Sequence, residues 1–162
     1  MVLAAGAATR YGSPKQRVFL PRVLEALRAT SVDEVVVVAG AYELEASARV
    51  VRCPDWARGP GASLRCGLVA LSHEPAAALV VLADGPDLDP CAVERVIRSW
   101  DGGNDALAAT YDGVTRSHPV LLPRGLWSGI PDEGARALPA RLVDCGDLRP
   151  PGDVDVPSSQ EG

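Results

Sequence analysis

The chain has 162 residues, 47% of them hydrophobic and 23% charged, which suits one soluble globular domain with a substantial core. The formal net charge of −5 excludes a broad nucleic-acid-binding surface, which needs many basic residues, but it does not exclude a site for a single nucleotide. The sequence has no apolar run of about 18 residues and no signal-peptide pattern, so we expect neither a membrane span nor a secretory leader.

A short first strand, Val2–Ala4, leads into a loop that contains Gly6, Arg10 and Lys15. Ligands of α/β sheets bind at the carboxyl ends of strands. Gly6 lets backbone N–H groups approach phosphate oxygens, and the two cations would neutralise phosphate charge. The spacing matches neither a P-loop nor a dinucleotide fingerprint. Taken alone, the loop also fits a surface connection with incidental charges.

The next elements alternate between helix and strand. Arg22 to Thr30 predicts a helix with Pro21 in its first turn. Glu34 to Ala39 predicts a strand buried on both faces, which is typical of a parallel sheet covered by helices, and Ala48 to Arg52 predicts a weaker strand.

A glycine-rich segment then precedes a helix predicted from Ser63 to Leu71. Gly59 and Gly61 lie just before Ser63, which we place in the N-cap region. The N–H groups of such a helix start can hold an anion or the edge of a base. An ordinary glycine-rich turn capped by Ser63 explains the same residues.

Ala78 to Ala83 predicts a second fully buried strand, followed directly by Asp84 and the turn Gly85-Pro86. A carboxylate at the carboxyl end of a buried strand faces the same crevice as the first loop. Mg²⁺ typically takes one or two carboxylates together with substrate phosphates. Asp84 is therefore a candidate metal ligand, although it also suits a turn cap.

The second half of the chain predicts one more helix and an antiparallel pair of strands. Asp89 is the expected N-cap of the helix, with Pro90 in its first turn. Ala106 to Tyr111 and Pro119 to Leu122 predict strands joined through the turn Asp112-Gly113. The result is an α/β fold with a mixed, mostly parallel sheet.

Asp153 and Asp155 lie in a C-terminal stretch rich in Pro, Asp, Ser and Gly, and either complete a metal site or belong to a solvated acidic tail. His118, which precedes a proline, is a weaker candidate for contact with an acceptor. The four cysteines and two histidines lack the spacing of a zinc site and favour reduced thiols in a cytoplasmic protein.

Together these features resemble the MobA-like NTP-transferase family, which includes molybdenum-cofactor cytidylyltransferase. The opening family pattern L-A-A/G-G-x-x-x-R-x-G-x-x-K is matched in register by Leu3, Ala4, Ala5, Gly6, Arg10, Gly12 and Lys15. Later motifs of the family are similar to Cys53 through Gly67, Asp84-Gly85-Pro86, Ser117-His118-Pro119-Val120, Pro131 through Arg136, and Asp153 through Pro157.

The resemblance implies a three-layer, Rossmann-like (GT-A-like) nucleotidyltransferase domain over residues 1–157, with 158–162 as a disordered tail. It implies catalytic roles for Arg10, Lys15 and Asp84, with Asp84 and Asp155 as the metal ligands. The nucleotide would contact the opening motif from Leu3 to Lys15 together with Gly61 and Ser63. His118 and Arg136 would lie on the acceptor side.

The implied reaction transfers a nucleoside monophosphate from an NTP to a phosphorylated acceptor such as molybdopterin, and releases pyrophosphate. The Ala4-Ala5 form of the loop favours CTP, and the expected cofactor is Mg²⁺, with Mn²⁺ as a substitute. A molybdoenzyme or its maturation factor is an expected partner. Two alternatives stay open: transfer to a sugar phosphate or another metabolite, and a non-catalytic nucleotide-binding accessory protein for metalloenzyme maturation.

Overall fold

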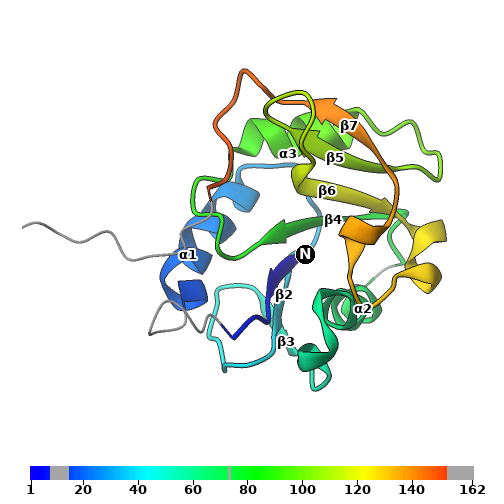
Figure 1. The fold of residues 1–162 in the computed structure, drawn as a ribbon. Helices are drawn as coiled ribbons and strands as arrows, with labels where there is room; N and C mark the ends of the chain where they lie inside the picture. The colour runs from blue at the N-terminus through cyan, green and yellow to red at the C-terminus, as the bar shows by residue number, and fades with distance from the viewer. Residues whose placement is uncertain (8–14, 73, 153–162) are drawn as a thin grey trace, which may run out of the picture.

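The computed structural model describes residues 1–7, 15–72 and 74–152, and within them the core is a mixed sheet of seven strands (Figure 1). The order across the sheet is β3-β2-β1-β4-β6-β5-β7. The strands are β1 (Val2–Ala4), β2 (Val36–Ala39), β3 (Arg49–Arg52), β4 (Ala77–Leu82), β5 (Ala106–Thr110), β6 (Ser117–Pro123) and β7 (Ala140–Asp144).

The sheet is mostly parallel because β6 alone among these strands runs opposite to its neighbours. β1 pairs in parallel with β2 and β4, and β7 pairs in parallel with β5. β6 is antiparallel to β4 and β5, with Val120 opposite Val80. The predicted mixed α/β sheet and the antiparallel pair in the second half are confirmed. The loop between β5 and β6 is longer than a two-residue turn; Asp112 accepts hydrogen bonds there from the N–H groups of Val114 and Thr115.

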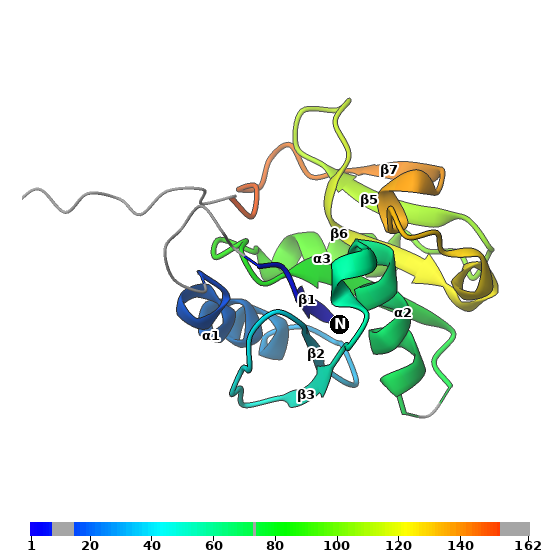
Figure 2. The ribbon, with the colours of Figure 1, turned by 60° about the horizontal axis from the view of Figure 1, so that its bottom comes forward.

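Helices cover both faces of the sheet (Figure 2). α1 (Lys15–Arg28) and α3 (Pro90–Arg98) pack on one face, and α2 (Pro60–Ala70) packs on the other. Side chains of the strands alternate between the two layers. Val37 and Val81 join the layer of α1 and α3, whereas the neighbouring Val38 and Val80 join that of α2. The described residues also form three short 3-10 helices: Trp56–Arg58, Arg124–Gly129 and Ala135–Ala137.

The first helix begins at Lys15 rather than at Pro21, so the predicted start was wrong. Its buried stripe of Leu20, Val23, Leu24 and Leu27 begins before the proline. Of these, Leu20 is the one that the earlier start adds, and its burial contributes roughly 1.5–3 kcal/mol, which offsets much of the roughly 3 kcal/mol cost of a proline inside a helix. Pro21 itself is exposed.

The helix after the glycine-rich segment also begins earlier than predicted. Gly59 occupies the N-cap position of α2 and Pro60 opens the helix, so Ser63 lies inside the first turns and does not cap it. The predicted cap of α3 is confirmed, because the Asp89 carboxylate accepts a hydrogen bond of 2.8 Å from the N–H of Cys91.

β7 was not predicted from the sequence. It is an edge strand in which Val143 alone is buried, so its side chains give no clear alternation of polar and apolar residues. None of the helices among the described residues is long and apolar enough to cross a lipid bilayer. The parallel strands β1 and β4 end side by side, and this edge positions the candidate site.

Candidate active site

The loop that leaves β1 is held by its carbonyl groups. The carbonyl oxygen of Ala5 accepts a hydrogen bond of 3.1 Å from the N–H of Ala41. The carbonyl oxygen of Gly6 accepts one of 2.9 Å from Gln16 Nε2, and that of Ala7 accepts one of 2.6 Å from the Tyr42 hydroxyl. Within the described part of the chain, the N–H groups of residues 6 and 7 donate to no acceptor. In this loop the carbonyl oxygens are held by hydrogen bonds, while two backbone N–H groups stay open to bind a ligand. Such an arrangement suits an anion, for example a phosphate.

A cavity of about 320 Å³ lies beside this loop at the carboxyl ends of β1 and β4. A volume of this size suits a small-molecule ligand. The cavity unites three predicted parts of the site: the first loop, the start of α2 and Asp84. Its lining residues are Leu3, Ala4, Ala5, Gly6, Gln16, Trp56, Ala57, Gly59, Pro60, Ser63, Leu82 and Asp84.

The start of α2 is clamped against the segment from Pro131 to Gly134. The N–H of Gly61 donates a hydrogen bond of 2.9 Å to the carbonyl oxygen of Asp132. The Asp132 carboxylate accepts hydrogen bonds from Arg65 and, at 3.2 Å, from Arg58. Gly61 is therefore buried in this contact and is not a lining residue of the cavity, whereas Ser63, two residues later, is.

The hydrogen bond from Arg65 and the charge of Arg58 lower the pKa of Asp132 below its ordinary value. The ionised carboxylate therefore stabilises the fold above the unfolded-state pKa of about 4, and this contribution disappears as the pH falls through the lower, folded-state pKa. We expect Asp132→Ala to lower the urea midpoint at pH 7, and the difference from wild type to shrink below about pH 4.

Chemical denaturation of both proteins from pH 7 downward measures this difference. Glu133→Ala is the matched control, since Glu133 is exposed and has no partner among the described residues. A difference between wild type and Asp132→Ala that stays constant at all pH values would contradict the proposed ionic clamp.

Asp84 also lines a second cavity of about 340 Å³, on the other side of the end of β4. Its other lining residues include Gly85, His118 and the C-terminal segment from Pro150 to Gly152. Gly85 is buried there, and a Cβ added to it would lie 3.1 Å from the ring of Pro151. The two cavities share two lining residues, Leu82 and Asp84.

His118 lines this second cavity and is half-buried. Burial lowers its pKa below the ordinary value, while the backbone of Val80 and the charge of Asp84 act in the opposite direction. The imidazole is therefore neutral at pH 7, with Nδ1 3.4 Å from the carbonyl oxygen of Val80. Arg136 lies exposed on the 3-10 helix Ala135–Ala137 and lines neither cavity.

Three predicted site residues cannot be placed. Arg10 and Asp155 lie outside the described residues, as does the predicted tail 158–162. Lys15 is the first residue of α1, which begins at the edge of the first cavity, but its side chain is not described.

Sequence reasoning missed Gln16, Tyr42 and Asp132, which hold the site in shape. Gln16 carried a signal: it occupies a buried position four residues before Leu20, where a helix facing the core would normally carry an apolar side chain. Tyr42 and Asp132 make contacts with residues far away in the chain, and local sequence patterns carry no information on these.

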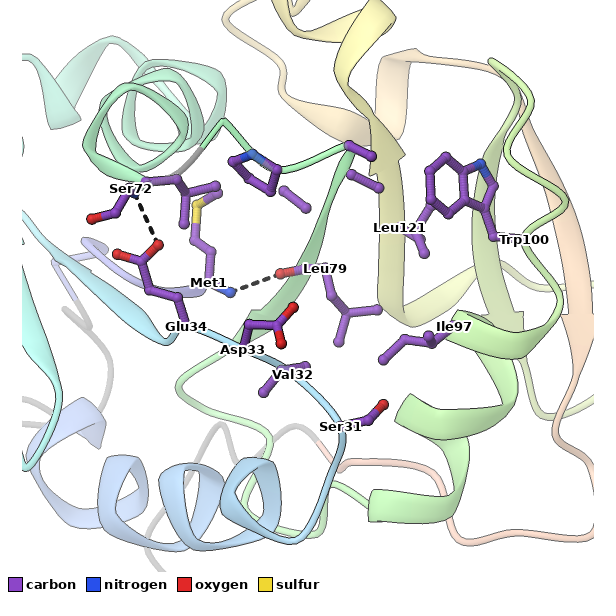
Figure 3. Close-up of a pocket in the computed structure, with 15 residues that line it drawn as sticks. Met1, Ser31, Val32, Asp33, Glu34, Ser72, Leu79, Ile97, Trp100 and Leu121 are labelled. Carbon is purple, nitrogen blue, oxygen red and sulfur yellow. Dashed lines mark hydrogen bonds between the residues drawn. The ribbon is translucent and has the colours of Figure 1, made fainter.

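Another cavity, of about 560 Å³, lies at the opposite, amino end of the strands (Figure 3). Two of its polar groups are already paired: the Met1 amino group donates a hydrogen bond to the carbonyl oxygen of Leu79, and the Glu34 carboxylate accepts one from the N–H of Ser72. The rest of its lining is mostly apolar and includes Ile97 and Trp100, and none of the predicted site residues lies there. The candidate site is therefore at the carboxyl ends.

A family model described as the MobA-like NTP transferase domain matches residues 1–144. No curated protein matches the chain. Among solved structures, Rv0371c from Mycobacterium tuberculosis has a TM-score of 0.77 and 24% identity, over 96% of this chain and 90% of that one. Its complex with manganese has a TM-score of 0.69 and 21% identity, over 88% and 85% of the two chains.

Two further solved structures share the fold. A nucleotidyl transferase from Methanothermobacter has a TM-score of 0.70 and 20% identity, over 88% of this chain and 84% of that one. Glucosyl-3-phosphoglycerate synthase from Mycobacterium tuberculosis, solved with Mn²⁺, UDP and glucosyl-3-phosphoglycerate, has a TM-score of 0.60 and 16% identity, over 80% and 57%. These similarities place the chain in the three-layer fold shared by nucleotidyltransferases and GT-A-like glycosyltransferases.

Proposed function

This chain belongs to the MobA-like NTP transferase family and is a nucleotidyltransferase, and we propose that it transfers CMP from CTP to a phosphorylated acceptor such as molybdopterin. The observation that carries the proposal is the position of Asp84 in the lining of both cavities. A nucleotide in the first cavity and an acceptor in the second would meet at this carboxylate.

The first cavity would hold the nucleotide. The available N–H groups of residues 6 and 7 would bind phosphate oxygens, and Arg10 and Lys15 would neutralise the charge of the triphosphate and of the leaving pyrophosphate. Ser63 and the backbone from Leu3 to Ala5 would line the nucleoside, and Gly61 would support that wall from behind. The preference for CTP rests on the Ala4-Ala5 form of the loop.

Asp84 places a carboxylate at this edge of the sheet, and hard divalent cations prefer such oxygen ligands. Asp84 would hold such a cation, with Asp155 as the second carboxylate, and Mg²⁺ commonly takes one or two carboxylates plus substrate phosphates. The bound ion would neutralise charge on the phosphates. The manganese complex of Rv0371c supports a divalent metal, and we propose Mg²⁺ with Mn²⁺ as a substitute.

The second cavity would hold the acceptor. A terminal phosphate oxygen of the acceptor attacks the α-phosphorus of CTP, and the bond from that phosphorus to the bridging oxygen of pyrophosphate breaks. Such chemistry depends mainly on positioning and charge neutralisation. Neutral His118 would orient the acceptor inside the cavity, and Arg136, exposed on the surface outside both cavities, would attract the acceptor phosphate by its charge. All four cysteines are free, which supports a cytoplasmic site of action beside molybdoenzymes or their maturation factors.

Pyrophosphate release tests the proposal. We expect release with CTP, Mg²⁺ and molybdopterin, and at least tenfold less with ATP, GTP or UTP, a difference of about 1.4 kcal/mol. Turnover with sugar 1-phosphates and none with molybdopterin would assign the enzyme to another acceptor class. Nucleotide binding without pyrophosphate release across the whole acceptor panel would overturn the catalytic proposal.

A further inference from the structure

One residue in the lining of the first cavity is aromatic. Among the described lining residues, Trp56 alone carries an aromatic ring, and its neighbours in the lining, Ala57 and Pro60, are also apolar. Trp56 is partly buried, because it packs against the core layer on the side of α2. This part of the cavity is therefore an apolar wall, in contrast to the available N–H groups of residues 6 and 7 in the first loop.

The indole N–H distinguishes Trp56 from the other two tryptophans. Trp100 Nε1 donates a hydrogen bond of 2.9 Å to the carbonyl oxygen of Gly103, and Trp127 Nε1 donates one of 3.0 Å to that of Leu122. Trp56 Nε1 has no partner among the described residues and is not an enclosed atom, so solvent reaches it. A tryptophan packed on one side and open at its N–H suits a boundary between apolar core and water. The accessible part of this side chain therefore adjoins the cavity that Trp56 lines.

Gly40, which follows β2, brings Trp56 close to the first loop. A Cβ added to Gly40 would lie 2.6 Å from the Cβ of Trp56 and 2.7 Å from the carbonyl oxygen of Ala5. The backbone of Gly40 therefore packs directly between the root of the Trp56 side chain and the start of the loop. The proposed nucleoside lies against the backbone from Leu3 to Ala5 and against Ser63, so Trp56 stands beside that position.

We propose that the base of the bound nucleotide stacks on the indole ring of Trp56. Every nucleobase is planar and has an apolar face, and such a face stacks favourably on an aromatic side chain. Stacking strengthens the binding of a nucleotide relative to that of its phosphates alone, because the phosphates have no such face. The inference rests on the proposed function, since it takes the first cavity as the nucleotide site.

The test measures dissociation constants of CTP and of inorganic triphosphate by calorimetry with Mg²⁺, for the full chain and its variants. Inorganic triphosphate offers the phosphates without a base. We expect Trp56→Leu to bind CTP about tenfold more weakly than the wild type, a difference of about 1.4 kcal/mol, and to bind inorganic triphosphate within about twofold. Trp56→Phe keeps an aromatic face but has no N–H, and it should bind CTP within about threefold of the wild type.

Tryptophan fluorescence gives a second measurement that does not depend on the leucine variant being folded. A base stacked on the indole should quench its emission, so CTP should quench the wild type and inorganic triphosphate should not. The quenching should disappear in Trp56→Phe, although this variant still binds CTP. Quenching of the same size in Trp56→Phe would place the base away from Trp56.

Trp100→Leu is the matched control, because Trp100 lines the cavity at the opposite end of the strands. This variant should bind both ligands as the wild type does. An equal loss of both ligands in a folded Trp56→Leu protein would mean that the indole supports the cavity wall without touching the base. Unchanged CTP binding in Trp56→Leu, or equally weak CTP binding in Trp56→Phe, would also refute the stacking while nucleotide binding stands. A wild type that binds no nucleotide would refute the proposed function itself.

Discussion

An Asp84→Asn variant should transfer nucleotide at least a hundredfold more slowly than the wild type, a loss of about 2.7 kcal/mol of transition-state stabilisation. Asparagine keeps the shape of the side chain but removes its charge, and a hard divalent cation prefers carboxylate oxygens. Asp84 lines both cavities, so the substitution weakens the metal at the point where the two substrates would meet. Charge stabilisation of this kind is usually the largest single contribution to phosphoryl transfer.

Asp87→Asn is the matched control for this experiment. Asp87 lies in the same loop, three residues later, but its carboxylate pairs with Arg22 at 3.0 Å and lines neither cavity. This variant should retain activity within about threefold, because exposed ion pairs contribute little. Mn²⁺ titration and circular dichroism would show whether the Asp84 variant is folded and has lost metal affinity. Unchanged turnover and metal affinity in a folded Asp84→Asn protein would remove Asp84 from the site.

The convergence of the first loop and Asp84 could be predicted because parallel strands carry their following loops to one edge of the sheet. Two buried apolar runs predicted β2 and β4, each followed by a turn, and the structure brings the end of β4 beside that of β1. The roles of Arg10, Lys15 and Asp155 stay predictions, because Arg10, Asp155 and the side chain of Lys15 lie outside the described part of the structure.

Contacts between distant segments could not be predicted. The sequence around Ser63 indicated a helix start, but the position of that start depends on Asp132, which is 69 residues further along the chain. The carbonyl oxygen of Asp132 accepts a hydrogen bond from the N–H of Gly61. Likewise, the side chain of Gln16 is held at Gly6, and no periodic pattern carries that geometry. Hydrophobic periodicity indicates which face of a helix or strand is buried, but it does not indicate which other segment of the chain that face packs against.

A Gly61→Ala variant should be destabilised by about 1–3 kcal/mol, which lowers the melting temperature of a domain of this size by roughly 2–12 °C. Helix propensity alone would favour alanine by up to about 1 kcal/mol. A Cβ at this position, however, would lie 1.7 Å from the carbonyl oxygen of Pro131 and 2.9 Å from the Cα of Asp132. These are backbone atoms, so no side-chain rotation relieves the overlap, and the steric term outweighs the gain in propensity.

The same substitution should weaken nucleotide binding at least tenfold, because relieving the overlap moves the start of α2, and with it Gly59 and Ser63, relative to the first loop. Gly129→Ala is the matched control: an added Cβ there meets no atom within 4 Å, and its backbone is not left-handed. Thermal unfolding and CTP titration of both variants test the argument. If Gly61→Ala melts and binds like Gly129→Ala, then the contact between α2 and the Pro131–Gly134 segment does not shape the nucleotide cavity, and the Asp132 clamp loses its assigned role.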